Sequence, residues 1–386
     1  MCTLCGPDEA VADGHRFSRR SMLAAIGGAA ALLGTAGCAG AATASDSSTQ
    51  VAAQPATGVA PGDRAPLELV LLGTKAGPPV DPLRVGISTA LVVDGSTYVI
   101  DCGRSAATQY VRSGLTLGSL AGIFITHLHA DHIADYYNFF LLGGSVPNQE
   151  GDALPGPVPV YGPGPAGGLP PKFGGGDAAT VNPADPTPGI AALTAQCHDA
   201  YAYSTNVFLR DMGIRDIRTL TDVHEIAIPD VGASFDNTAP AMKPFVVMED
   251  ERVKVTAILV PHGPVFPAFA FRFDTRHGSV TFSGDTTYSD NIVELAKGSD
   301  VLVHEAISVE GFDAPAVFLD HLLQSHVEVQ KVGPIAQRAG VSKLVLTHIS
   351  DLAGNPLDAD KWKKWAQAGY DGEVVVGDDL QRIALA

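Results

Sequence analysis

The stretch Gly122–Asp135, GIFITHLHADHIAD, decides what this chain can be. Its apolar run Ile123–Ile125 predicts a buried strand, which leads directly into four side chains that can bind metals: His127, His129, Asp131 and His132. The backbone must turn sharply after the strand, so two imidazoles two residues apart can converge on one cation while the next two side chains face another. The stretch therefore predicts ligands for two metal ions at the end of a strand.

The order H-x-H-x-D-H after a strand resembles the signature of the metallo-β-lactamase superfamily. This resemblance implies an α/β fold, a four-layer αβ/βα sandwich with a binuclear metal site at the edge of its sheets. We assign residues 67–386 to that hydrolase domain.

Composition narrows the classes of partner. The chain has 386 residues, 46% of them hydrophobic, which is ample for a large core. Its formal charge of −17 opposes contact with phosphates and predicts that neither nucleic acid nor an anionic membrane is a partner. No apolar run of 18 residues follows residue 40, so the sequence does not predict an integral membrane protein.

The first 44 residues are predicted to be an export signal. The stretch Ser18–Leu23 (SRRSML) precedes an apolar segment, Ala24–Ala36, and resembles a twin-arginine signal, which implies a periplasmic or cell-envelope location. Thr35–Cys38 (TAGC) resembles a lipoprotein box, so Cys38 is a candidate lipid anchor, with cleavage after Ala44 as the alternative. Residues 45–66 are rich in small and polar residues and predict a flexible linker.

The predicted domain begins with strands. Leu67–Leu72 is an apolar strand, and a hairpin around Asp94-Gly95 ends at Asp101. The family resemblance implies that Asp101 lies beneath the metals and supports a ligating histidine, whereas the alternative is a turn or helix-cap residue.

The aromatic residues of 136–140 are expected to be core, with a pocket wall as the alternative. Residues 143–190 are dense in Gly and Pro and predict an irregular insertion.

Later segments supply further ligands. The strand Val253–Val260 delivers His262 between two prolines, well placed as a third ligand to the first metal. Asp285 follows another strand on a Gly turn, and the resemblance implies that its two oxygens bridge the cations. By the same resemblance His348 completes the second metal. The predicted metal ligands are therefore His127, His129, His262, Asp285, Asp131, His132 and His348.

Three further motifs, H-E-A at 304–306, S-H-x-E at 325–328 and L-T-H at 346–348, resemble the tRNase Z-like branch of the superfamily. This implies that Glu305 orients His326 and raises its pKa, and that His326 protonates the leaving group. His321 competes for that task. Val327 stands where the branch usually has Ser or Thr, so a helper hydroxyl is missing. Asp131 is expected to accept the proton of the attacking water.

In that branch a basic arm grips tRNA, whereas residues 133–245 of this chain hold five Lys or Arg against twelve Asp or Glu. We therefore expect an exported hydrolase that uses two divalent ions, zinc before manganese or iron, to cleave a small sulfate, phosphate or carboxylate ester. An aromatic dehalogenase or lactonase is the enzymatic alternative, and a metal-binding envelope protein without turnover is the alternative of another class. A homodimer is a further expectation from the family.

Overall fold

The computed structural model describes residues 65–148 and 151–386, which belong to one compact unit, Gln54–Ala386. The predicted export signal, Cys38 and most of the predicted linker lie outside the described residues. Within the described ranges, no helix combines the length and the apolar character that crossing a membrane requires.

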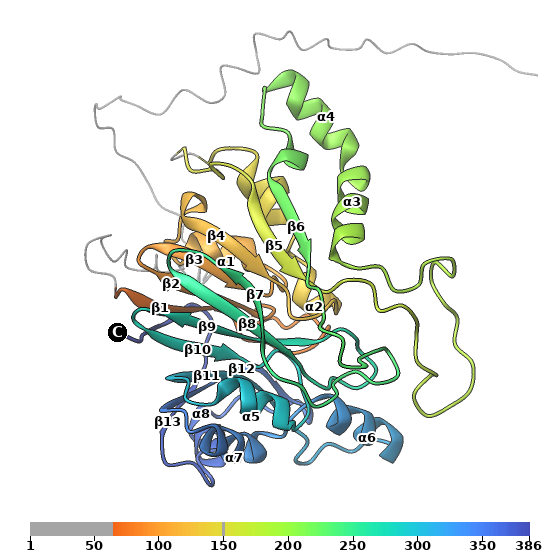
Figure 1. Cartoon of the computed structure of the whole chain (residues 1–386), viewed down its shortest axis with the longest axis vertical. Coiled ribbons are helices and arrows are strands. Elements are labelled where there is room, and N and C mark those ends of the chain that lie inside the picture. The colour runs from red at the N-terminus through yellow and green to blue at the C-terminus, as the bar shows by residue number, and fades with distance from the viewer. Residues whose placement is uncertain (1–64, 149–150) are drawn as a thin grey trace, which may run out of the picture. The chain divides into compact units, whose positions relative to one another are not determined.

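Two seven-stranded sheets form the centre of the fold (Figure 1). The first sheet has the order β14-β1-β2-β3-β4-β5-β6, with bounds β1 Leu67–Gly73, β2 Ser88–Val93, β3 Ser96–Ile100, β4 Leu120–Phe124, β5 Val158–Gly162, β6 Thr221–Glu225 and β14 Gln381–Ala384. The second has the order β13-β12-β11-β10-β9-β8-β7, with bounds β7 Phe245–Glu249, β8 Val253–Leu259, β9 Phe269–Thr275, β10 Gly278–Phe282, β11 Val301–Ser308, β12 Lys343–Asp351 and β13 Glu373–Val376. In the order given, the first sheet has three antiparallel pairings followed by three parallel ones, and the second has three parallel pairings followed by three antiparallel ones.

Helices cover the outer faces of both sheets (Figure 1). Their bounds are α1 Ala106–Arg112, α2 Ala130–Ile133, α3 Ile190–Ala200, α4 Ala202–Asp211, α5 Asp290–Ala296, α6 Ala316–Ser325, α7 Val329–Ala339 and α8 Ala359–Ala366, with single turns at Leu117–Ser119, Phe139–Gly144 and Ile217–Thr219. One apolar cluster joins α1 and α3 to the first sheet, and another joins α5, α7 and α8 to the second. The predicted four-layer sandwich is confirmed.

A third apolar cluster lies between the sheets and explains why central strands read as continuous apolar runs. All seven residues of β1 are buried, because the sheet it belongs to is covered on both faces. The ring of Phe124 on β4 packs against those of Phe271 and Phe273 on β9, with centroids 5.6 and 5.0 Å away. The aromatic side chains of 136–140 are buried in the outer cluster, as expected of core residues, and Tyr137 also borders a cavity of about 120 Å³.

The strand ends that carry polar motifs meet at one edge of the sandwich. β3 and β4 run parallel, as do β10, β11 and β12, so their carboxyl ends lie side by side. The chain between β5 and α3, residues 163–189, contains no helix or strand.

Candidate metal centre

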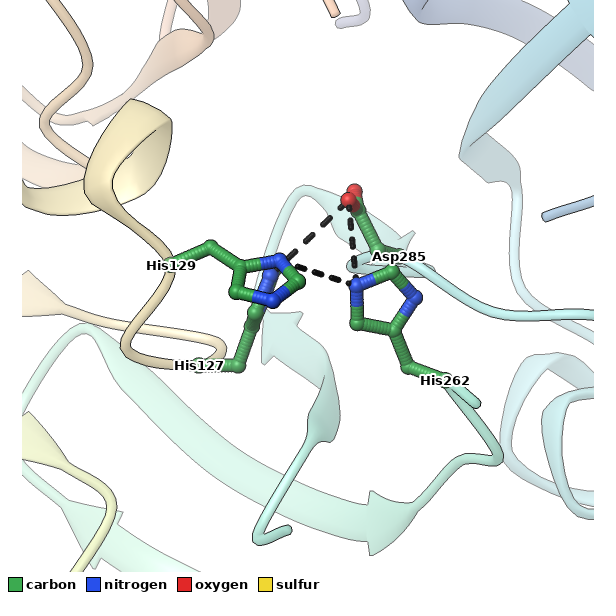
Figure 2. A group of neighbouring side chains, drawn as sticks. All are labelled: His127, His129, His262 and Asp285. Carbon is green, nitrogen blue, oxygen red and sulfur yellow. Dashed lines mark hydrogen bonds and ion pairs between the residues drawn. The ribbon is translucent and has the colours of Figure 1, made fainter. Parts of the chain in front are cut away.

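A first group of four side chains converges at this edge (Figure 2). His127 and His129 follow β4, His262 follows β8 and Asp285 follows β10, and one possible ligand atom of each lies within 4.8 Å of the others. His129 Nδ1 is 3.1 Å from His262 Nε2, and His127 Nε2 is 3.9 Å from Asp285 Oδ2. His129 is the exposed member of the group, whereas the other three are buried.

A second group contains Asp131 and His132 of α2 and His348 of β12. Asp131 Oδ2 is 3.4 Å from His348 Nε2 and 3.6 Å from His132 Nε2. The same oxygen of Asp285 that faces the first group lies 3.3 Å from His132 Nε2 and 3.2 Å from His348 Nε2. Asp285 therefore joins the two groups, and the structure brings all seven predicted ligands together.

The donor atoms of this cluster fit metal cations. His127 Nε2, His132 Nε2 and Asp131 Oδ1 are buried and have no hydrogen-bond partner. Burying such atoms unpaired costs free energy, and the two imidazole nitrogens are accounted for if they bind cations. Burial also lowers the pKa of His262 to about 3, which keeps the ring in the neutral form that binds a metal. The cluster is a candidate metal site.

Unusual backbone conformations aim two of these ligands. His348 interrupts the ladder between β11 and β12, because Glu305 pairs with Thr347 and Ala306 pairs with Ile349. The φ angle of His348 is +45°, so a β-bulge turns its side chain toward the cluster. Gly284, before Asp285, has a φ of +58°, and an added Cβ would lie 2.6 Å from the carbonyl oxygen of Phe269. Only glycine fits that turn.

Neighbouring groups fix the rings in place. Asp101 Oδ2 accepts a hydrogen bond from His132 Nδ1 at 2.8 Å, while Asp101 Oδ1 accepts one from the backbone N–H of Thr126, also at 2.8 Å. The carbonyl oxygen of Ser325 is 2.7 Å from His262 Nδ1. These contacts leave Nε2 of both rings free to face the cluster. Thr126 and Ser325 were not predicted. Ser325 acts through its backbone carbonyl, which every residue possesses, and the Thr126 hydroxyl, which donates to Asp101 Oδ2 at 2.8 Å, lies just outside the H-x-H-x-D-H motif.

Glu305 and His326 form a pair beside the second group. Glu305 Oε1 lies 3.1 Å from His326 Nδ1 and accepts from the backbone N–H groups of Thr286 and Val327 at 3.2 and 3.1 Å. The side chain of His326 is 16% exposed and borders Asp285, 4.0 Å away. As expected from the sequence, Val327 offers no helper hydroxyl, and its contact with Glu305 is made by its backbone N–H, which its side chain does not predict.

The electrostatics of this pair favour a charged imidazole. Burial by itself lowers the pKa of His326, but the charge of Glu305 and its hydrogen bond raise it more, to about 9. His321, the competing candidate, packs its ring against Phe173 with centroids 4.6 Å apart. The structure therefore places His326, rather than His321, next to a carboxylate at the cluster.

Known proteins resemble this chain over most of its length. The model of the Metallo-beta-lactamase superfamily matches residues 83–142. A ribonuclease Z from Mycobacterium avium is 30% identical over 323 residues, which covers 83% of this chain and 98% of that protein. A ribonuclease Z from Mycobacterium bovis is 28% identical over 321 residues, with the same coverage. Among solved structures, the short form of human tRNase Z has a TM-score of 0.55 at 21% identity and covers 83% of this chain and 99% of that one.

These relatives overturn two predictions. They are named as ribonucleases, so the expectations of a small ester substrate and of no nucleic-acid partner are wrong. The error came from the charge argument. A net charge summed over residues 133–245 is an average, whereas an RNA strand contacts only the local groups around the site.

Proposed function

Because the chain belongs to the metallo-β-lactamase superfamily and to its ribonuclease Z branch, we propose that it is a ribonuclease that hydrolyses a phosphodiester bond in RNA. The observation that carries the proposal is the 30% identity to a ribonuclease Z over 98% of that protein. The cluster of imidazoles and carboxylates supports the same chemistry, because metal-dependent hydrolases bind their cations with side chains of these two kinds.

We propose that the cluster holds two divalent cations, and that they are zinc. One would lie among His127, His129 and His262, the other among Asp131, His132 and His348, with Asp285 between them. Imidazole nitrogen and carboxylate oxygen are ligands that zinc prefers, and manganese and iron accept them too. When bound, these cations supply Lewis-acid chemistry that activates water and polarises the phosphoryl group.

The chain's own residues would handle the protons. Asp131 Oδ2 already accepts from the backbone N–H of Gly77 at 3.0 Å, whereas its Oδ1 is unpartnered and can accept the proton of the attacking water. The water oxygen then bonds to phosphorus, and the bond from phosphorus to the departing oxygen breaks. His326 holds its Nδ1 on Glu305, so its Nε2 can protonate that oxygen.

Purified, zinc-loaded protein tests the proposal when it is incubated with a precursor tRNA that carries a 3′ extension and with an unstructured RNA. We expect cleavage of RNA by the wild type and by H277A, a variant at a histidine that pairs with Asp94 outside the cluster. We expect none by D285N. Absence of RNA cleavage with zinc, manganese and iron would refute the proposal.

We also propose that the twin-arginine-like stretch Ser18–Leu23 directs export to the periplasm or cell envelope. Its support is the sequence pattern alone. Fractionation of cells that express the full chain should place it outside the cytoplasm, and R19K/R20K should retain it inside. Equal distribution of both would contradict export. The lipid anchor at Cys38 and the homodimer stay predictions.

A further inference from the structure

A cavity of about 710 Å³ adjoins the candidate metal centre. One wall contains Leu128, His129 and Ile133, and the others come from residues 163–189, from Leu193 and Gln196 of α3, and from Pro264–Pro267. His129 belongs both to this wall and to the first metal group. A substrate held at the cluster therefore extends directly into the cavity.

The walls of this cavity are chemically suited to a flat, weakly charged group. Most are formed by proline, glycine, alanine and larger apolar residues, with two aromatic rings, Phe173 and Phe266. Lys172 and Asp177 bring one charge of each sign, and Lys172 Nζ already donates to the carbonyl oxygen of Gly175 at 3.0 Å. A row of phosphates finds no matching row of cations here. The base is the part of a nucleotide that fits such walls.

Phe173 is held in place before any ligand arrives. Its half-buried ring packs against the ring of His321 on α6, with centroids 4.6 Å apart. Immediately after it, three glycines have φ angles of +76°, +80° and +80°, which let the chain turn away sharply: Gly174, Gly175 and Gly176. A fixed aromatic wall binds a flat ligand without the entropic cost of ordering a mobile side chain.

We propose that this cavity is a nucleobase subsite, in which an unpaired base next to the scissile phosphate stacks on Phe173. The inference rests on the proposed ribonuclease function and adds how the RNA is held beside the metal centre. A base inside a duplex stack cannot reach the cavity, so the nucleotide at this position is single-stranded or turned out of its helix. Stacking accepts any base, so this subsite selects for an unpaired nucleotide rather than for sequence.

Kinetics on two substrates test the subsite. We expect F173A to raise KM for a single-stranded RNA about tenfold, the scale of one lost base stack, with little change in kcat. Hydrolysis of methyl 4-nitrophenyl phosphate, a phosphodiester without a base, should change less than about twofold. F173Y, which keeps an aromatic ring at this position, should bind RNA as tightly as the wild type does. F318A is the matched control, because Phe318 is an exposed phenylalanine on α6 that does not line the cavity.

Binding of AMP separates this inference from the proposed function, because it requires no cleavage. Calorimetry with the zinc-loaded full chain should show AMP binding to the wild type, F173Y and F318A, and binding at least about tenfold weaker to F173A. Thermal unfolding of F173A confirms that the variant is folded. Equal AMP affinity of F173A and wild type, or equal losses on both phosphodiesters, would overturn the subsite. Absence of RNA cleavage together with Phe173-dependent AMP binding would overturn only the ribonuclease assignment.

Discussion

At the scale of single residues, His326 has the clearest separable role. It touches Glu305 through Nδ1 and borders the metal cluster, yet it is not among the seven predicted ligands. We expect H326A to keep its metal content and to lose about 10²- to 10⁴-fold in kcat, the contribution of a positioned acid. Elemental analysis and steady-state kinetics measure the two quantities. H277A should match the wild type in both, and full activity of H326A would show that another group donates the proton.

We expect Asp101 to act on metal affinity through His132, with which it forms a hydrogen bond. Its two oxygens accept from His132 Nδ1 and from the N–H of Thr126, so an asparagine must present its NH₂ to one of these donors. If that NH₂ faces His132, Nδ1 becomes the acceptor and Nε2 carries the hydrogen, which blocks a cation. We expect D101N to bind zinc about 10- to 100-fold more weakly in competition with a chromophoric chelator. D371N, at an exposed aspartate, serves as the control. Unchanged affinity of D101N would exclude this role.

At the scale of elements, the ends of strands carry the site, and their turns constrain it. The turn after β10 places Gly284 against Phe269 and Asp285 in the cluster. We expect G284A to lower the free energy of unfolding by about 1–3 kcal/mol, because the added Cβ meets a backbone oxygen and the positive φ is strained. Urea denaturation measures this.

A second glycine separates the two causes. Gly298 also has a positive φ of +67°, but nothing lies within 4 Å of an added Cβ. G298A should therefore lose only the conformational cost, about 1 kcal/mol, and should keep its metals. Equal losses in G284A and G298A would show that the contact with Phe269 contributes nothing.

At the scale of the whole molecule, the candidate metal centre draws its residues from both sheets. Four predicted ligands follow the first sheet, and three belong to the second, the latter being His262, Asp285 and His348. Cations bound there stabilise the folded chain by mass action, by about 4 kcal/mol at a thousandfold excess over Kd. We expect a chelator to lower Tm by several degrees and zinc to restore it. D285N should show no such shift, and a Tm indifferent to zinc in the wild type would argue against a metal that spans the sheets.

The charges around the cavity bear on how RNA would be held if the proposed function is right. Lys172 is the one Lys or Arg among the described residues that line the cavity, so few phosphates are expected to contact the protein there. A plot of log affinity against log salt for single-stranded RNA should have a slope shallower than about −2, since each phosphate contact contributes about −0.7. Filter binding with D285N, the variant expected not to cleave RNA, measures this slope. A steep slope would mean that a basic surface, rather than base stacking, dominates binding.

The sequence by itself determined the strands and the types of ligand. Leu67–Leu72 and Val253–Val260 are apolar runs that predict buried strands, and the motif from His127 to His132 places four donors within six residues. Such patterns are local, so they can be recognised without knowledge of the fold. His262, Asp285 and His348 could be named because each follows an apolar run, where strand ends meet.

Only the tertiary structure decided which of these residues meet and how. His348 lies beside Asp131 although 217 positions separate them in the sequence. A β-bulge turns its side chain there, and no pattern of residues predicts that bulge. The contact with Glu305 distinguishes His326 from His321 as the candidate acid. Backbone N–H groups also donate to Glu305, and no side-chain pattern indicates them. The cavity beside His129 arises from segments far apart in the chain. Residue types indicate which side chains can bind metals or move protons. Whether those side chains meet depends on long-range packing. A charge summed over many residues does not show where on the surface the charges lie.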